Sequence, residues 1–376
     1  MKQDFSAFIH VLRGFLQGSP VSLPGSVCWQ TLLELARMHG LQPVLWYMLR
    51  DRGDVPADVL SALRRGFHTA VFAEAQLDSL RQQLTGRFSQ AGIDHAFLRG
   101  ICIKEDYPVS ALRTMADLDV LVRTEDYPAI QRIAASLGGK LCEEDDNHRS
   151  YRFPTGVCVE FHPNLLRHTS LGAAINPGWQ YVAPGSHVLD PAGHYINLVC
   201  HLAHHFCQGG TGVRSVMDVW VTRNRRHSQP DRALVLGVLE ECGLRSFVEN
   251  IEALSEAWFG EGELTPELEA LGAYILTSGA YGTLERKLLS NAAFSGSKWA
   301  SLGAKLFPPK AMLEDSYPWS KGKPALLPAA WLARLVSKST RERGGALKRW
   351  GKDNLSITPE AVEQQRALLR SFGFRI

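Results

Sequence analysis

The sequence contains no long hydrophobic run and no recognisable leader. No segment approaches the roughly 18 uninterrupted apolar residues that indicate a membrane-spanning helix, so we expect no membrane partner. The N-terminal stretch 1–19 lacks the apolar core of a signal peptide, because Asp4 and Arg13 interrupt it. Its apolar residues recur at helical spacing instead, which predicts an amphipathic helix of the mature protein.

Cysteine is scarce and irregularly spaced. The seven cysteines are Cys28, Cys102, Cys142, Cys158, Cys200, Cys207 and Cys242. An odd number with no Cys-x-x-Cys motif argues against a disulfide framework and against a zinc ribbon. The pattern predicts reduced thiols and a cytoplasmic protein.

Neither sign of charge dominates the whole chain. There are 41 Lys and Arg residues against 38 Asp and Glu, a formal net charge of +3. The balance is uneven, since the stretch from Arg286 to Asp353 holds 14 basic residues and 4 acidic ones. This basic stretch either meets an anionic partner such as nucleic acid or forms solvated helix faces.

Hydrophobic periodicity divides the chain into three regions. Residues 1–90 have the spacing of helices, residues 91–190 mix strand and helix patterns, and residues 191–376 are again helical. We therefore expect an α+β fold, in which a small mixed sheet is flanked by N-terminal and C-terminal helical regions.

The helical regions carry recognisable ends. A helix over 29–39 should end at Gly40, which is a favourable C-cap residue. The stretch 57–90 predicts a long helix that breaks near Gly86. Two closing helices are expected over 330–343 and 361–372.

The central region predicts at least four strands and two helices. Residues 95–98 form a short strand candidate, and 117–123 alternates in the manner of a half-buried strand. Helices are expected over about 101–107 and over 127–137. The runs 150–153 and 157–161 should form a hairpin, while the acidic run 143–146 before them predicts a loop.

The strand over 117–123 carries two acids with one residue between them. Side chains alternate along a strand, so Asp117 and Asp119 point to one face and Leu118 and Val120 to the other. Two adjacent carboxylates repel each other and are costly to desolvate unless a cation or water covers them. Hard divalent cations such as Mg²⁺, or Mn²⁺, suit such oxygen ligands.

A third acid, Glu160, interrupts the apolar pattern of the later strand. If that strand lies beside the Asp117–Asp119 strand, three carboxylates converge, as in-line nucleotidyl transfer with one or two metals requires. Glu160 is then also the candidate for the base, and His162 is expected to orient Glu160 or to lie near the substrate. The alternative is a pair of solvated strand ends, with His162 as a terminal residue.

Positive charge lies close to this acidic group in the sequence. Gly100 ends one strand and opens a helix, where backbone N–H groups can approach a phosphate. Arg99, Lys104 and Arg113 could add charge for nucleotide binding.

Histidines recur later along one helix. His194, His201 and His205 fall near one face, at intervals of seven and four residues. A zinc site would need a further ligand, which no nearby Cys or acid supplies, so the pattern favours a histidine face that lines the cleft. Arg214 and Asp218 are spaced to pair along the next helix, or to reach the substrate cleft.

These motifs together resemble a known family. Leu98-Arg-Gly100, then Arg113 before the strand Asp117-Leu-Asp-Val-Leu-Val122, then Val159-Glu-Phe-His162 are similar to the uncharacterised nucleotidyltransferase family of the polymerase-beta-like superfamily. Weaker resemblances are a His-rich helix containing His201, His204 and His205, an Arg/Asp helix containing Arg214 and Asp218, and a C-terminal segment containing Phe307, Met312, Leu313 and Tyr317.

The resemblance implies a nucleotidyltransferase fold, a divalent metal and an NTP donor. It assigns Asp117, Asp119 and Glu160 as metal ligands and Gly100 to the nucleotide-binding turn, and it places His162, His204, Arg214 and Asp218 near the cleft. Many nucleotidyltransferases have serine after that glycine. Ile101 stands here instead, so phosphate contact is expected from the backbone, Arg99 and Lys104.

We therefore expect a metal-dependent nucleotidyltransferase that moves a nucleoside monophosphate from an NTP to an acceptor hydroxyl or phosphate. The acceptor is a small molecule, a peptide, a protein or an RNA. Two alternatives keep the same fold: an inactive nucleotide- or RNA-binding module, favoured by the missing turn hydroxyl, and a toxin-like transferase that acts on tRNA.

Overall fold

The chain forms two compact units. The computed structural model describes residues 2–23, 26–144, 148–166, 174–225, 229–280, 282–294, 313, 317–320, 322–333 and 357–375. The first unit comprises residues 1–203 and 211–280, and the second comprises residues 204–210 and 281–376. All candidate site residues except His204 and His205 belong to the first unit.

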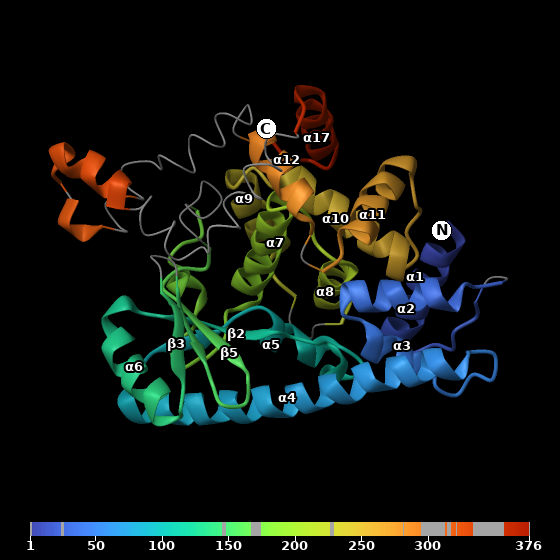
Figure 1. Cartoon of the computed structure of the whole chain (residues 1–376), viewed down its shortest axis with the longest axis horizontal. Helices are drawn as coiled ribbons and strands as arrows, with labels where there is room; N and C mark the ends of the chain where they lie inside the picture. The colour runs from blue at the N-terminus through green and yellow to red at the C-terminus, as the bar shows by residue number, and fades with distance from the viewer. Residues whose placement is uncertain are drawn as a thin grey trace. The chain divides into compact units, whose positions relative to one another are not determined.

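A five-stranded mixed sheet lies within the first unit (Figure 1). In spatial order its strands are β1 (His95–Phe97), β2 (Asp117–Val122), β5 (Cys158–His162), β4 (Arg149–Arg152) and β3 (Lys140–Glu144). β2 and β5 run parallel, and the other neighbours are antiparallel. The α+β class and the mixed sheet are therefore confirmed, as is the hairpin of β4 and β5.

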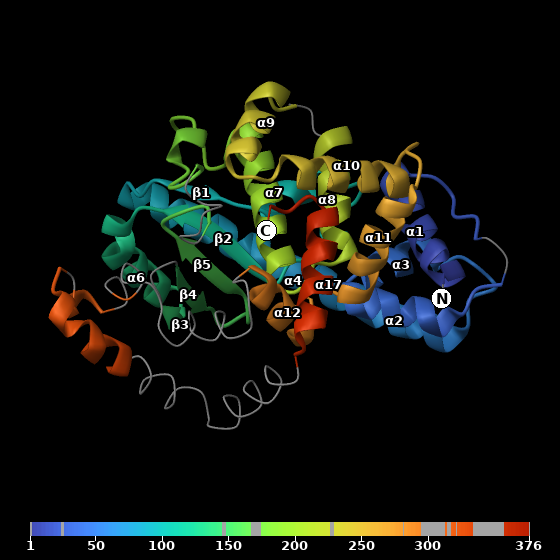
Figure 2. The same cartoon turned by 90° about the horizontal axis from the view of Figure 1, so that it is seen from above.

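Two helices cover one face of this sheet. α4 (Ala57–Ala91) runs along the sheet and α6 (Tyr127–Ser136) packs beside it, as both views show (Figures 1 and 2). α4 contributes apolar residues three or four apart, which form one stripe of the helix. The shared core comprises Leu77, Leu80, Leu84 and Phe88 of α4, Ile130 and Ala134 of α6, and Leu118, Val120, Val122, Val159 and Phe161 of the sheet.

Further helices complete the first unit. They are α1 (Lys2–Gln17), α2 (Trp29–His39), α3 (Gln42–Leu49), α5 (Gly100–Ile103), α7 (Pro191–Cys207, to residue 203), α8 (Val213–Asn224), α9 (Arg232–Glu241), α10 (Arg245–Phe259) and α11 (Pro266–Ser278). α2 ends at Gly40, whose φ of 67° is left-handed, as the sequence predicted. Arg13 of α1 donates to the carbonyls of Ala257 and Trp258 at 2.7 Å and so fixes α1 to α10.

A helix that spans a membrane has to be both long and apolar. Within the ranges that the structure describes, no helix combines the two properties.

Two local expectations were wrong. α4 continues through Gly86 to Ala91, because the glycine keeps helical geometry and tolerating it costs only about 1 kcal/mol. Glu143 and Glu144 belong to β3 and not to a loop. β3 is an edge strand whose five residues are all exposed, so it shows none of the apolar alternation by which strands are predicted.

The second unit contains α12 (Leu284–Phe294) and α17 (Pro359–Ser371). The two are joined by Gln365, whose side-chain amide donates to Ser290 Oγ at 3.1 Å. α17 confirms the predicted closing helix over 361–372. Of the other closing helix, residues 327–333 are helical and the remainder lies outside the described residues, as does most of the basic stretch from Arg286 to Asp353.

Candidate active site

The parallel pairing of β2 and β5 brings distant acids together. Asp119 lies opposite Glu160, and Asp117 lies opposite Cys158. Because Leu118 and Val120 point into the core under α4, the acids share the opposite face of the sheet. The adjacency of these strands, on which the expected constellation depends, is confirmed.

Asp119 is the most enclosed of the three carboxylates. Only 7% of the residue is exposed, and its Oδ1 accepts from Arg99 Nη1 at 2.6 Å and from His162 Nε2 at 2.8 Å. Burial alone would raise the pKa of Asp119, but Arg99 and His162 outweigh it and hold the pKa well below its ordinary value. This carboxylate is therefore ionised throughout the physiological range.

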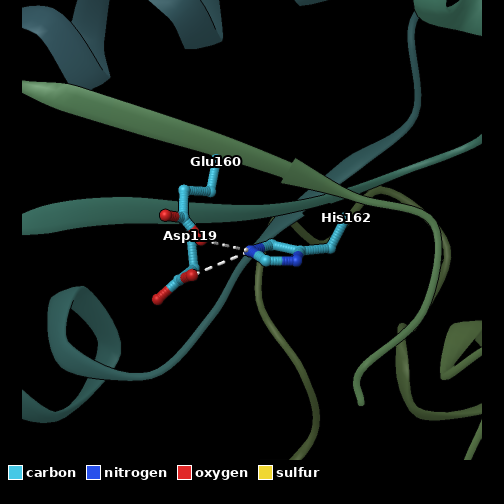
Figure 3. Close-up of side chains that lie close together, drawn as sticks. All are labelled: Asp119, Glu160 and His162. Carbon is cyan, nitrogen blue, oxygen red and sulfur yellow. Dashed lines mark hydrogen bonds and ion pairs between the residues drawn. The ribbon is translucent and has the colours of Figure 1, made fainter. Parts of the chain in front are cut away.

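His162 bridges Asp119 and Glu160 (Figure 3). Its Nε2 is also 3.5 Å from Glu160 Oε2, and the hydrogen bond from His162 lowers the pKa of Glu160. One ligand atom from each of Asp119, Glu160 and His162 lies within 4.8 Å of the others. Among the described residues this is the group whose spacing could hold a metal ion, so His162 stands where the sequence predicted Asp117.

Asp117 lies at the exposed start of β2. Although part of Asp117 is exposed to solvent, the protein around its carboxyl group reduces the hydration of the charged form, and this, followed by repulsion from Asp119 and Glu160, raises the pKa of Asp117 to about 6, while the charges of Arg99 and Arg214 oppose the rise. The face of the sheet therefore carries more negative charge than its neighbouring cations compensate. A bound cation would relieve this repulsion.

We expect Asp117→Asn to stabilise the metal-free protein at neutral pH. A carboxyl whose pKa is raised by folding keeps its proton more tightly in the folded state, so stability is lost as pH rises from 3.8 to about 6. The amide cannot ionise and escapes this loss. Urea unfolding with a chelator present should show the variant's advantage above this window and no advantage below it. An advantage independent of pH would contradict the charge argument.

Arg99 adopts an unusual backbone conformation beside Asp119. Its φ of 59° and ψ of −124° are costly for a residue with a Cβ, by about 1–3 kcal/mol. The surrounding hydrogen bonds hold it there, since Leu98 N donates to Asp119 O and Ile103 N donates to Arg99 O. This strained turn points the guanidinium at the Asp119 carboxylate.

Gly100 has a packing role that differs from the expected phosphate approach. A Cβ at this position would lie 2.1 Å from Arg113 Nη1 and 2.6 Å from Met115 Sδ. α5, which begins at Gly100, is a single turn, so its N-terminus offers only a weak dipole to a phosphate. Glycine is needed at this position because the buried guanidinium of Arg113 packs against its Cα and leaves no room for a Cβ.

Gly100→Ala should therefore destabilise the protein by about 1–3 kcal/mol, the usual cost of overpacking. Gly86→Ala is the matched control, because a Cβ there meets nothing within 4 Å and the helix should gain about 0.5–1 kcal/mol. Urea unfolding of both variants measures the two changes. Equal effects at the two positions would show that helix propensity, and not the packing of Arg113, decides the outcome.

Two predicted phosphate contacts are engaged elsewhere. Lys104 is buried and forms an ion pair with Glu74 of α4, with Asp78 3.9 Å away. Arg113 is buried against Asp218 of α8, with contacts of 2.7 and 3.2 Å. Both cations are compensated within the fold, so the structure does not favour their assignment to a nucleotide.

The predicted pairing along α8 was wrong. Asp218 pairs with Arg113, and it also accepts from Tyr107 Oη at 2.7 Å. Arg214 instead donates to the backbone and hydroxyl oxygens of Thr114, at 2.8 and 2.9 Å. The charge of Arg214 lowers the pKa of Asp117, so α8 places one cation near the acidic face.

Two residues near the acids were missed. His148 is buried and stacks on His162 with a ring-centroid distance of 5.6 Å, and its charge helps to lower the pKa of Glu160. Ser150 lies opposite Glu160 on β4. His148 directly precedes β4 and Ser150 lies two residues further on, so an extended chain places both on one face. This two-residue spacing was the signal that the sequence offered.

The histidine helix contributes no comparable group. His204 belongs to the second unit, where its ring contacts His205 at 6.0 Å. Within the described ranges, the ligand-spaced group of Asp119, Glu160 and His162 is the one found, and it does not include His194, His201 or His205.

Of the comparisons with known proteins, the family models give the informative match. A family model described as "Uncharacterised nucleotidyltransferase" matches residues 25–260, which include the whole sheet and α8. No curated protein sequence matches the chain. Among solved structures, the CCA-adding enzyme of Thermotoga maritima complexed with tRNA is similar at 11% identity and a TM-score of 0.21, over 81% of this chain and 84% of that one. So distant a likeness supports no argument about mechanism or substrate.

Proposed function

Because the chain belongs to the uncharacterised nucleotidyltransferase family, we propose that it is a metal-dependent enzyme that moves a nucleoside monophosphate from an NTP to an acceptor hydroxyl or phosphate. The observation that carries this proposal is the register of β2 against β5, which sets Asp119 opposite Glu160. A buried Asp119 facing a half-buried Glu160 places two repelling carboxylates side by side, an arrangement that is costly to desolvate without a cation.

The donor set fits a divalent ion such as Mg²⁺ or Mn²⁺. Asp119 and Glu160 offer carboxylate oxygens, and the exposed Asp117 extends the same face towards solvent. When bound, the ion neutralises phosphate charge and polarises the phosphorus for attack. Nucleotidyl transfer needs little else from the protein beyond positioning and charge.

Arg99 and Arg214 are the cations we assign to the triphosphate. Both act electrostatically on Asp117, and the hydrogen bonds of Arg214 among the described residues go to the oxygens of Thr114. Arg99 shares Asp119 with His162, and its Nε is buried without a hydrogen-bond partner among the described residues. Its guanidinium is therefore free to exchange part of its contact with Asp119 for a phosphate oxygen.

Labelled nucleotides test the proposal directly. The purified protein is incubated with each of the four NTPs, ATP included, labelled at the α-phosphate, together with Mg²⁺ or Mn²⁺ and total RNA, protein or small-molecule extract. We expect label to move to one acceptor pool with release of pyrophosphate. Nucleotide binding without turnover under every condition would support a binding module instead, and label on tRNA would identify the toxin-like alternative.

We also propose that the protein works in the cytoplasm. Its seven cysteines are all free, which is the usual state of thiols in a reducing compartment.

A further inference from the structure

We propose that His162 is the third protein ligand of the metal ion, and that the centre it completes binds Mn²⁺ in preference to Mg²⁺. The inference rests on the proposed function, because it concerns the same site. It departs from the set of three carboxylates that the sequence motif suggests. The observation behind it is the position of His162 Nε2 between Asp119 and Glu160 (Figure 3).

The separations of the donor atoms match a shared ion. His162 Nε2 is 2.8 Å from Asp119 Oδ1 and 3.5 Å from Glu160 Oε2. Adjacent ligands of an octahedral ion that binds at about 2.1 Å lie about 3 Å from each other. Two of the three separations are thus close to the edge of such an octahedron, and the third pair of donor atoms, from Asp119 and Glu160, lies within 4.8 Å.

The two ends of the acidic face differ in their surroundings. His162 follows Glu160 by two residues on β5, so both lie on the same face, and only 8% of His162 is exposed. Asp117 precedes Asp119 by two residues on β2 and therefore lies at the other end of the acidic face, at the exposed start of the strand. The protein therefore closes the inner side of the site with an imidazole and leaves Asp117 towards the side that solvent and substrate can reach.

An imidazole ligand changes the metal preference. Mg²⁺ favours oxygen donors and retains its water, whereas first-row transition ions accept nitrogen donors readily. Two carboxylates with one imidazole therefore favour Mn²⁺ over Mg²⁺. As a ligand, Nε2 must offer its lone pair, so the ring proton that now faces Asp119 is carried by Nδ1 of the neutral ring.

Electron paramagnetic resonance of Mn²⁺ bound to the full-length protein tests the assignment. We expect a nitrogen hyperfine coupling in the wild type that changes when the protein carries isotopically labelled histidine. His162→Gln should remove the coupling and weaken Mn²⁺ binding roughly 10–100-fold, with a much smaller effect on Mg²⁺. His148→Gln is the matched control, because His148 stacks on His162 yet lies outside the ligand group, and it should retain the coupling.

The outcomes separate this inference from the proposed function. Mn²⁺ that binds through Asp119 but shows no histidine coupling would overturn the assignment of His162 and leave the enzyme proposal standing. A coupling lost in His148→Gln and kept in His162→Gln would overturn it as well. A wild-type protein that binds neither ion, or binds both unchanged in Asp119→Asn, would defeat the two proposals together. The isotope experiment uses the wild type alone, so it does not depend on the folding of any variant.

Discussion

Asp119→Asn is expected to lower the rate of nucleotidyl transfer by roughly 10³-fold. The substitution keeps the size of the side chain and removes the buried charge that lies opposite Glu160. Loss of a metal ligand removes several kcal/mol of transition-state stabilisation, and about 4 kcal/mol corresponds to that factor. Initial rates with an α-labelled NTP measure the effect in whichever acceptor pool becomes labelled.

The matched control is Glu143→Gln, which removes an exposed carboxylate from the edge strand of the same sheet. Its rate should equal that of the wild type. Asp119→Asn should also remain folded, because its amide oxygen can still accept from Arg99 and His162 and because repulsion with Asp117 and Glu160 is reduced. A folded Asp119→Asn protein with near wild-type activity would refute the proposed role of Asp119.

The second large effect concerns the buried ion pair between Arg113 and Asp218. Arg113→Met or Asp218→Asn should each destabilise the protein by about 3–5 kcal/mol, because each leaves one buried charge uncompensated. Tyr107 adds to the cost at Asp218, since its hydroxyl also donates there and its pKa is raised by burial and by that carboxylate. Urea unfolding at neutral pH measures the change.

A double variant sharpens this prediction. Arg113→Met combined with Asp218→Leu removes both charges, so its loss of stability should be smaller than the sum of the single losses. Arg245→Met is the control, because its pair with Glu249 lies on the surface and contributes at most about 0.5 kcal/mol. Additive single effects would show that the two buried groups do not depend on each other.

The Arg113–Asp218 pair also bears on the site. Arg113 crosses the Cα of Gly100, and Gly100 follows Arg99 in the strained turn beside Asp119. The pair thus fixes the turn from which Arg99 reaches the acidic face. Its expected contribution to catalysis is one of position, since no atom of Arg113 needs to touch the substrate.

Local patterns in the sequence were sufficient for the strands that carry the acids. The alternation of Asp117, Leu118, Asp119 and Val120 predicted both a strand and the face to which the acids point, because one face had to be apolar. The hairpin of β4 and β5 followed from its turn residues. β3 was missed because neither of its faces is buried. Its sequence therefore lacks the alternation of apolar and polar residues that marks a half-buried strand.

Contacts between distant residues were decided by the tertiary structure. Nothing local indicates that Lys104 pairs with Glu74 or that Arg113 pairs with Asp218, since each cation has several acids at similar sequence distance. A charged side chain that enters the interior must find a counter-charge there, and the packing of α4 and α8 determines which one. The ion pairs of these two cations within the fold could therefore not be predicted from the sequence.

The sequence by itself determined the fold class, the strand that carries Asp117 and Asp119, and the face to which their side chains point, because side-chain alternation and burial act over a few residues. Only the tertiary structure decided that Glu160 lies opposite Asp119, that His162 bridges the two, and that Arg99 and Arg214 are the neighbouring cations. The pairing of β2 with β5 joins segments some forty residues apart. Such pairings depend on how whole elements pack, which no short stretch of residues encodes.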